Sequence, residues 1–371
     1  MKAPRISVVC TGDPLQRSTW SGTPLRICEQ LKILERLGPA LDAEGGLPRP
    51  LMWVVRAFSR AIYLNSHESA RGQLPRAVRG WNVRQKLCKA PDFPVLHIGT
   101  KHLPLKQPLI GQKHYLYCDA TWHSWLKYST SRHLYTSRLI QDAERMERQA
   151  YSQMNHIFSI SEYVRADLLE HYGVAPGKVT VVGTGRGAIE PFFEEKDYSK
   201  GTVLFVAKER FRDKGGELLL QGFHIARERR PSLGLTIAGD PRYVELADQK
   251  RGVRALGYVS LAELQGLFNR ASLFALPAYN EPWGLVYLEA LSCRTPVLGF
   301  ARNAFPELSG HGQYGFSVDQ VSAEGVANAL LKAFEEPKLL REMGLRGQEY
   351  SLKNFTWERT VERMVDVIDR S

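Results

Sequence analysis

Short apolar runs alternate with longer stretches of mixed polarity along most of the chain. Apolar runs that predict strands lie at residues 6–10, 95–98, 115–117, 156–160, 179–182, 203–206, 235–238, 253–259, 273–276 and 296–300. Between many of them, apolar residues recur at helical spacing. Strands that alternate with helices are typical of a parallel sheet covered on both faces. The pattern therefore predicts an α/β chain with two doubly wound sheets in tandem.

Capping residues place the helices between these strands. The first helix is predicted to begin near Ser21-Gly22-Thr23, with Pro24 at an early helical position, and its apolar positions continue to Leu37. Ser161 is a suitable N-cap for a helix that ends by Gly173. Further helices are predicted at residues 136–154, 217–229, 260–271, 285–292 and 356–370.

A glycine-rich and then acidic stretch at residues 183–201 separates the two series and is interpreted as the interdomain linker. The expected organisation is an N-terminal domain over 1–185, a linker over 186–201, a C-terminal domain over 202–352 and a final helix over 353–371 that packs back on the N-terminal domain. Doubly wound sheets bind ligands at the carboxyl ends of their strands. Two such domains facing each other would form a cleft.

Composition excludes several classes of protein. The chain has 371 residues, 43% of them hydrophobic and 24% charged, which is typical of a globular protein. No apolar run approaches the roughly 20 residues of a membrane-spanning helix. The first apolar run is too short for a signal peptide. The five cysteines form no C-x-x-C pair, so they predict neither a disulfide framework nor a zinc site. We expect a cytoplasmic protein.

Positive charge is concentrated in one part of the chain. The net charge is +11, and residues 49–113 contain twelve basic residues but only Glu68 and Asp92 as acids. Such an excess indicates an anionic partner, although a solvated basic face is the simpler alternative. An anionic lipid surface, a phosphorylated acceptor and nucleic acid all fit the charge. No RNA-binding motif or zinc-finger spacing supports nucleic acid, and we expect none.

The segment 49–65 narrows this choice. Arg49, Arg56 and Arg60 would share one face of a helix whose other positions are mostly apolar and include Trp53. That pattern is typical of a helix lying in a membrane interface. A core helix with exposed arginines explains it equally well. Association with the inner face of a membrane through residues 49–113 is therefore one of two hypotheses.

The most informative chemistry lies in residues 271–300. An apolar strand leads into Glu281-Pro282-Trp283-Gly284, and a helix follows that carries Glu289. The amides of Gly284 and Leu285 at the helix start would form an anion site, strengthened by the helix dipole. Two acids beside such a site could hold a diphosphate that joins a sugar to a ribose. The alternative interpretation is that both acids are solvated loop residues that bind no ligand.

Two lysines support the same interpretation. Lys208 follows a buried strand, and Lys214 precedes Gly215-Gly216 and a helix. Cations at the carboxyl end of a strand would neutralise charge that grows on a departing diphosphate, although solvated strand-end charges are common. The sequence has no D-x-D and no metal-ligand spacing. We therefore expect neither a metal ion nor another cofactor.

The segment NEPWGLVYLEALSCRTPV, with its E-x7-E spacing, resembles the donor site of retaining glycosyltransferases of family 4. The resemblance extends over nearly the whole chain, including SISEYVRADLLEHYGV and VLFVAKERFRDKGGELLLQGF. It implies the GT-B fold, two Rossmann-like domains facing a cleft. It also implies a nucleotide-sugar donor, with Glu289 on the ribose diol, Glu281 on the sugar hydroxyls, and Lys208 and Lys214 on the phosphates. The family commonly has Arg where Lys208 stands, and Arg210 or Arg212 could compensate.

The resemblance assigns further positions. Gly22 and Thr23 match the family's glycine loop near the donor phosphate, and the nucleotide base would pack near Tyr258 and Val259. Asp119 follows a strand where many members carry a histidine near the sugar. It could orient the acceptor or accept its proton, or it could be an ordinary loop or N-cap aspartate.

The predicted function is transfer of a sugar from a nucleotide-sugar to a glycan, glycolipid or other hydroxyl acceptor. The resemblance implies retention of anomeric configuration without a metal ion, and polysaccharide or glycolipid synthesis as the setting. Two alternatives stay open. One is another GT-B enzyme, such as a sugar phosphorylase or a nucleotide-sugar epimerase. The other is a non-enzymatic binder of lipid or polysaccharide.

Overall fold

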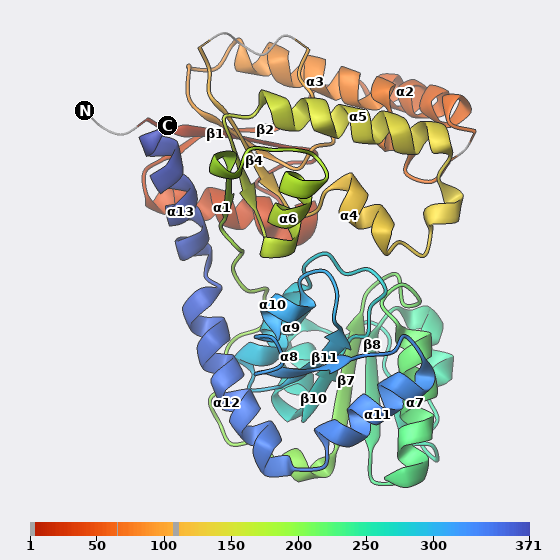
Figure 1. Cartoon of the computed structure of the whole chain (residues 1–371). Coiled ribbons are helices and arrows are strands. Elements are labelled where there is room, and N and C mark those ends of the chain that lie inside the picture. The colour runs from red at the N-terminus through yellow and green to blue at the C-terminus, as the bar shows by residue number, and fades with distance from the viewer. Residues whose placement is uncertain (1–3, 65, 107–110) are drawn as a thin grey trace. The chain divides into compact units, whose positions relative to one another are not determined.

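The computed structural model describes residues 4–64, 66–106 and 111–371. These residues form two compact units. The first comprises residues up to 127 together with 131–184 and 357–371, and the second comprises residues 128–130 and 185–356. Each unit has one parallel six-stranded sheet, in agreement with the α/β prediction (Figure 1).

The sheet of the first unit has the order β2-β1-β3-β4-β5-β6. Its strands are β1 (Ile6–Cys10), β2 (Leu37–Asp42), β3 (Val95–Ile98), β4 (His114–Cys118), β5 (His156–Ser159) and β6 (Val179–Val181). The helices of this unit are α1 (Thr23–Ile33), α2 (Arg49–Ile62), α3 (Gln73–Leu87), α4 (Trp122–Lys127), α5 (Ser137–Gln153), α6 (Glu162–Glu170) and α13 (Trp357–Arg370).

The sheet of the second unit has the order β12-β11-β10-β7-β8-β9. Its strands are β7 (Thr202–Ala207), β8 (Gly234–Gly239), β9 (Val253–Ala255), β10 (Leu273–Ala275), β11 (Val297–Phe300) and β12 (Gly315–Val318). The helices of this unit are α7 (Gly216–Arg229), α8 (Leu261–Arg270), α9 (Leu285–Ser292), α10 (Phe305–Leu308), α11 (Ala323–Ala333) and α12 (Pro337–Asn354).

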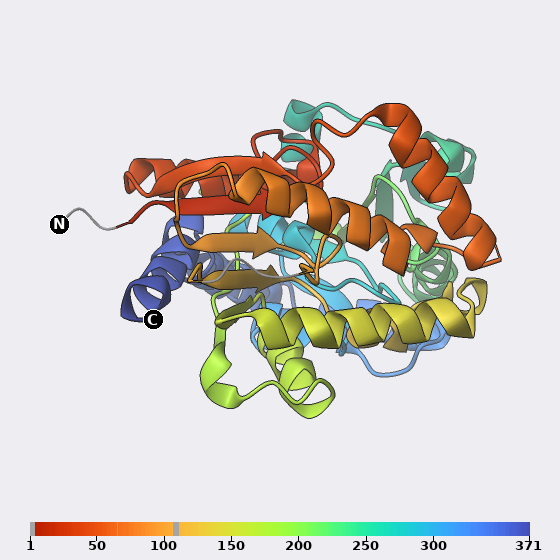
Figure 2. The same cartoon turned by 90° about the horizontal axis from the view of Figure 1, so that it is seen from above.

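Both sheets reverse their direction of growth once, between β1 and β3 and between β7 and β10. Because parallel crossovers are right-handed, this reversal puts helices on both faces of each sheet. In the first unit α3 and α5 lie side by side over one face (Figure 1 and Figure 2), whereas α1 packs against α13. The central strands β1, β3 and β4 are fully buried, which explains their continuous apolar sequences.

The final helix is fastened to the first unit by an ion pair. The Arg36 guanidinium donates to both carboxylate oxygens of Asp369, at 2.9 and 2.7 Å, and also to the carbonyl of Pro4 at 2.7 Å. The Arg36 side chain is buried, so these bonds hold the last turn of α13 beside the start of the chain. Helix α13 thus belongs to the first unit although segment 185–356 of the second unit directly precedes it in sequence.

Several helix starts match the capping predictions. Helix α1 begins at Thr23 with Pro24 in its first turn. The Ser161 side chain accepts a hydrogen bond from the Val164 amide at the start of α6, and Thr136 caps α5 in the same way.

Two predicted boundaries were wrong. Helix α1 ends at Ile33, and Leu37 begins β2, a strand that the pattern did not indicate. Strand β2 contains Gly38-Pro39, which resembles a turn, and it tolerates proline because it forms the edge of its sheet. The predicted strand 253–259 ends at Ala255. Strand β12 and helices α3, α4, α10, α11 and α12 were not predicted.

The segment 49–65 forms helix α2, with Asn65 outside the described residues. Met52, Val55 and Ser59 face inward, and Tyr63 just beyond the helix joins a core cluster with Trp122 and Leu139. The opposite side, however, leaves large apolar side chains in solvent. Trp53 is 73% exposed and Phe58 61%, with Leu51, Val54 and Ile62 also exposed.

The basic stretch 49–113 is not one continuous charged face. Arg76 is buried, donates to the carbonyls of Thr100 and Leu103 and lies 3.7 Å from the Glu147 carboxylate. Arg79 is also buried. Residues 107–110 lie outside the described residues. Part of the positive charge predicted to face a partner is therefore buried in the interior instead.

Candidate functional site

The second unit places the predicted donor residues around two loops. Residues 208–215 connect β7 to α7, and residues 276–284 connect β10 to α9. Strands β7 and β10 are parallel neighbours, so their carboxyl ends lie together. The Tyr279 amide donates to the Asp213 carbonyl at 2.8 Å and joins the two loops directly.

Lys214 and Glu281 meet across these loops. The Lys214 Nζ lies 2.8 Å from Glu281 Oε2, and both side chains are about one-fifth exposed. The structure thus pairs one predicted phosphate ligand with one predicted sugar ligand, 67 positions apart in the sequence. A partly buried ion pair of this kind keeps a fixed position for each charge while leaving edges of both groups open to a ligand.

Gly284 shapes the start of α9. Its φ of +84° is a left-handed conformation, and a Cβ atom there would lie 2.6 Å from Cδ2 of Tyr287 and 3.1 Å from Cγ of Glu281. Glycine is therefore required both by the turn and by the close approach of Tyr287. The turn directs the first amides of α9, including that of Leu285, outward from the helix N-terminus, where the macrodipole favours an anion.

Glu289 lies in the middle of α9 and is half-buried. Its Oε1 accepts a hydrogen bond of 2.8 Å from the Ala188 amide, and Gly187 allows the carboxylate to approach the backbone. Burial raises the pKa of Glu289, although the amides of Ala188 and Ile189 and the charge of Lys208 oppose that shift. The segment after β6 therefore contributes the backbone that orients Glu289, which the sequence did not reveal.

The remaining predicted donor residues are more exposed. Lys208 directly follows β7 and is exposed, and its carbonyl accepts a 3.4 Å hydrogen bond from the Tyr258 hydroxyl. Tyr258 is 62% exposed, and Val259 beside it is half-buried. Arg210 and Arg212, the two possible substitutes, pair with Asp213 at 3.0 Å and Glu217 at 3.3 Å.

In the first unit, Gly22 ends an unusual turn. Trp20, Ser21 and Gly22 all have positive φ angles, of 48°, 54° and 86°. The Thr23 amide donates to the Trp20 carbonyl, so it is already engaged in the turn. The Trp20 ring packs against Gly99 at the end of β3, where a Cβ atom would collide with it. A left-handed conformation is costly for the non-glycine residues Trp20 and Ser21, and such strain is concentrated at functional loops.

Asp119 follows β4 and lies among charged residues that the sequence did not single out. Burial raises its pKa, and the positive charges of Arg71 and Lys101 oppose that shift. Glu68 bridges these cations, at 2.9 Å from Arg71 and 3.8 Å from Lys101. The Arg71 guanidinium also stacks over the Trp122 ring at 4.9 Å. Arg71 and Lys101 both belong to the basic stretch 49–113. The positive charge of that stretch is the feature of the sequence that could have indicated these residues.

The histidines near Asp119 have structural partners. His97 lies 2.9 Å from His102 and 3.0 Å from His114, and burial lowers the pKa of all three. His123 contacts Asp167 at 2.6 Å. Within the described ranges, no group of three or more His, Cys, Asp or Glu side chains could hold a metal ion. No described helix is long and apolar enough to span a bilayer.

Two family models match the chain in succession. Residues 44–186 match the model described as Glycosyltransferase Family 4, and residues 189–350 match that of Glycosyl transferases group 1. The chain belongs to the group 1, family 4 glycosyltransferases. This confirms the resemblance drawn from the E-x7-E segment, and Glu281 and Glu289 both lie within the second match.

Similar proteins extend this result. D-inositol 3-phosphate glycosyltransferase of Pseudarthrobacter chlorophenolicus is 29% identical over 215 residues, which cover 53% of this chain and 51% of the relative. The chain thus spans about half the length of such curated relatives.

Solved structures resemble the fold over its full length. WaaG, a glycosyltransferase involved in lipopolysaccharide biosynthesis, has a TM-score of 0.67 at 17% identity and covers 98% of this chain and 99% of its own. HepE of Anabaena, in complex with UDP and glucose, has a TM-score of 0.64 at 14% identity and covers 98% and 100%. These likenesses confirm the GT-B fold class.

Proposed function

We propose that this family 4 member transfers a sugar from a nucleotide-sugar to a hydroxyl acceptor, with retention of anomeric configuration and without a metal ion. The observation that carries the proposal is the Lys214–Glu281 pair beside the N-terminus of α9. A cation and a helix N-terminus suit the diphosphate of the donor, and the adjoining carboxylate suits the hydroxyls of its sugar.

The other residues complete the donor site in this proposal. Glu289, oriented by the Ala188 amide, would accept hydrogen bonds from the ribose diol. Lys208 would join Lys214 at the phosphates, with Gly284 and Leu285 supplying amides. The exposed Tyr258 and Val259 would cover the nucleotide base, and Gly22 and Thr23 of the first unit would approach the phosphate. HepE binds UDP, so uridine nucleotides are the first candidates.

In the proposed reaction, the leaving diphosphate and the attacking acceptor hydroxyl lie on the same face of the sugar. As the bond from the anomeric carbon to the diphosphate oxygen breaks, the acceptor hydroxyl oxygen bonds to that carbon and its proton passes to the leaving phosphate. Lys208, Lys214 and the α9 amides would stabilise the negative charge on that phosphate. Asp119, with Arg71 and Lys101 around it, would orient the acceptor.

Substitution of Glu281 tests the proposal. Glu281→Gln keeps the shape of the side chain but removes the charge that holds Lys214 and the sugar hydroxyls. We expect transfer from UDP-sugars to fall at least about 100-fold, while UDP still raises the melting temperature. Glu349→Gln, which changes an exposed acid in the same unit, is the matched control. Full transfer by Glu281→Gln would remove Glu281 from the mechanism, and no stabilisation by any nucleoside diphosphate would refute donor binding.

We also propose that the protein associates with an anionic membrane, on its cytoplasmic face, and uses a glycolipid or a growing polysaccharide as acceptor. The support is α2, whose exposed side carries Leu51, Val54 and Phe58, with Trp53 between this side and the arginines. An exposed apolar stripe flanked by cations suits a bilayer interface better than water.

Vesicle co-sedimentation tests the membrane proposal. Trp53→Ser and Phe58→Ser together should strongly reduce binding to vesicles that contain phosphatidylglycerol, because both side chains would enter the interface. Trp81→Ser, which removes an exposed tryptophan from α3, should leave it unchanged. If the α2 variant still sediments like the wild type, α2 is not the membrane contact.

A further inference from the structure

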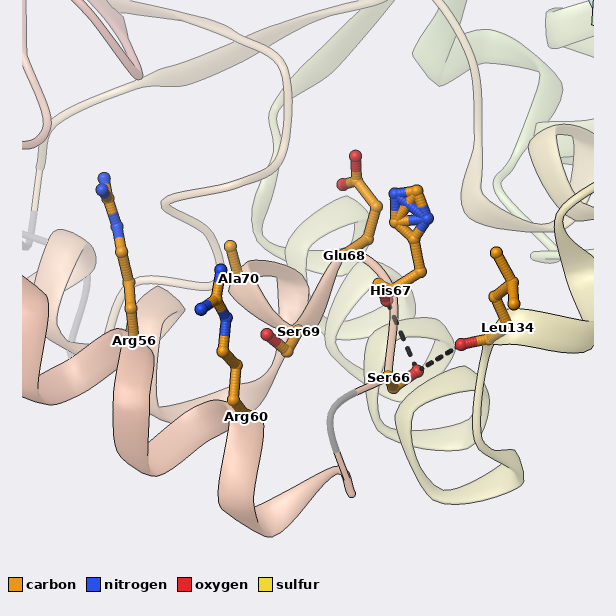
Figure 3. A pocket seen from close by; sticks show the side chains of 8 residues that line it. All are labelled: Arg56, Arg60, Ser66, His67, Glu68, Ser69, Ala70 and Leu134. Atoms are coloured by element: carbon orange, nitrogen blue, oxygen red, sulfur yellow. Dashed lines mark hydrogen bonds between the residues drawn. The ribbon is translucent and has the colours of Figure 1, made fainter.

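A hollow of about 590 Å³ opens in the first unit between α2 and the segment 66–70. Arg56 and Arg60 line it from α2, and His67 and Glu68 line it from the facing segment. Figure 3 shows these four side chains extending from the two segments toward the same side. We call this hollow, with its lining by Arg56, Arg60, Ser66, His67, Glu68, Ser69, Ala70 and Leu134, the arginine hollow. Its volume is in the range of small-ligand sites.

The arginine hollow has an excess of positive charge. Glu44 is shared by Arg56 at 2.8 Å and Arg79 at 2.7 Å, so one carboxylate serves two guanidinium groups. Glu68 is likewise shared by Arg71 and Lys101. Glu68 is the acid in the lining, and Glu44 contacts the hollow only through Arg56; each of these two acids pairs with two cations.

Arg60 adds a further charge that no acid compensates. Its guanidinium has no ion-pair or hydrogen-bond partner among residues 4–64, 66–106 and 111–371. It lies one helical turn from Arg56, and like charges at this spacing repel each other. A bound dianion between the two guanidinium groups would replace that repulsion by attraction.

The opposite side of the hollow is held in place. The Ser66 hydroxyl donates to the Leu134 carbonyl at 3.1 Å, and the His67 amide donates to the same carbonyl at 2.9 Å. The His67 ring stacks on Tyr135 with a centroid distance of 5.8 Å. These contacts fix an imidazole opposite the two arginines, so the hollow presents three nitrogen-bearing groups without requiring a rearrangement.

We propose that the arginine hollow binds a phosphate group of the acceptor, either on a soluble phosphorylated sugar or in a lipid headgroup. Arginine presents a planar fork of donors that matches phosphate oxygens, and two such forks suit a phosphomonoester dianion. Glu68 connects the hollow to Asp119. It forms ion pairs with Arg71 and Lys101, and the charges of these same two residues act on Asp119. An acceptor anchored by its phosphate would thus reach toward the end of β4. The statement that the bound phosphate belongs to the acceptor rests on the proposed function. The binding of phosphate to the hollow does not depend on it.

Direct titration of the intact protein tests the proposal. The probes are glucose 6-phosphate, glucose and glucuronate at constant ionic strength, with ³¹P resonance shifts and calorimetry as readouts. We expect saturable binding of glucose 6-phosphate, about tenfold or more weakened by Arg60→Gln and less by Arg60→Lys. Arg49→Gln removes the same charge from the same helix outside the hollow and should leave the affinity within about twofold.

A second arm distinguishes the source of the phosphate. Dihexanoyl phosphatidic acid, a lipid phosphomonoester used below its micelle concentration, replaces glucose 6-phosphate. Binding of either probe that depends on Arg60 supports the proposal, and the probe that binds more tightly identifies the source. Absence of binding by both probes overturns it. So does equal weakening by Arg49→Gln and Arg60→Gln, or glucuronate binding as tightly as glucose 6-phosphate. Stabilisation by UDP, measured in parallel on Arg60→Gln, reports separately on the donor site.

Discussion

Lys196 should make the stability of the second unit depend on pH in a way that a single substitution can isolate. Its Nζ donates to the carbonyls of Phe268 at 3.0 Å and Cys293 at 2.8 Å and to the Thr295 hydroxyl at 2.5 Å. Among the described residues, no acid pairs with it. Burial lowers the pKa of Lys196 from 10.5 to about 7, with a smaller contribution from Arg294 and opposition from Cys293.

The sign of the effect follows from proton linkage. Above pH 7 the folded chain loses the Lys196 proton, whereas the unfolded chain keeps it up to about pH 10.5. The unfolded state therefore binds more protons in this window, so the free energy of unfolding rises with pH. Integrated from pH 7 to 9, the gain is about 2 kcal/mol.

Lys196→Met removes this titration. The variant also leaves two carbonyls without their donor, so its stability at a single pH is not diagnostic. The wild-type free energy of unfolding minus that of the variant should instead increase by about 2 kcal/mol between pH 7 and 9. Lys250→Met changes an exposed lysine in the same unit and should show a constant difference.

The unfolding of the second unit can be followed separately. Trp283 is the one tryptophan in its sequence, and it is 5% exposed and packs on Phe355. Labelling with 5-fluorotryptophan gives it a ¹⁹F resonance whose folded and unfolded populations can be measured in urea. Parallel curves for wild type and Lys196→Met over this pH range would refute the reasoning, because they would mean that Lys196 titrates equally in both states.

Two further predictions concern local structure. Gly284→Ala should destabilise the second unit by about 1–2 kcal/mol, since the new Cβ would lie 2.6 Å from Tyr287 at a φ of +84°. Thermal denaturation measures this effect, with Gly234→Ala, where nothing lies within 4 Å, as the control. An unchanged melting temperature of Gly284→Ala would contradict the prediction. Arg36→Gln should speed amide hydrogen exchange in the last turns of α13 by about tenfold, because it removes the bidentate bond to Asp369. The control Arg26→Gln breaks only an exposed pair with Glu29 and should leave the exchange rates of α13 unchanged.

Most of the scaffold could be predicted because buried parallel strands have a strong local signal. The apolar runs at β1, β3 and β7 and the caps at Thr136 and Ser161 identify elements without tertiary information. Strand β2 could not be found in this way, since an edge strand loses little by containing Gly38-Pro39. The family resemblance likewise depended on a short-range feature of the sequence, the spacing between Glu281 and Glu289.

The arrangement of side chains around the candidate site was decided by tertiary structure. That Lys214 bonds Glu281 follows from the pairing of β7 with β10, and that Ala188 orients Glu289 follows from the path of the chain after β6. Neither contact has a signature in the sequence, because each joins residues 67 or 101 positions apart.

The basic stretch shows the same division most clearly. The sequence by itself determined its charge and the helical spacing of Arg49, Arg56 and Arg60, because these depend only on composition and period. Only the packing decided that Arg76 and Arg79 are buried, that Trp53 and Phe58 are exposed, and that Arg60 lacks an acid among the described residues. Periodicity shows that a helix has two different faces, but the neighbours that the fold brings against it determine which face meets the solvent.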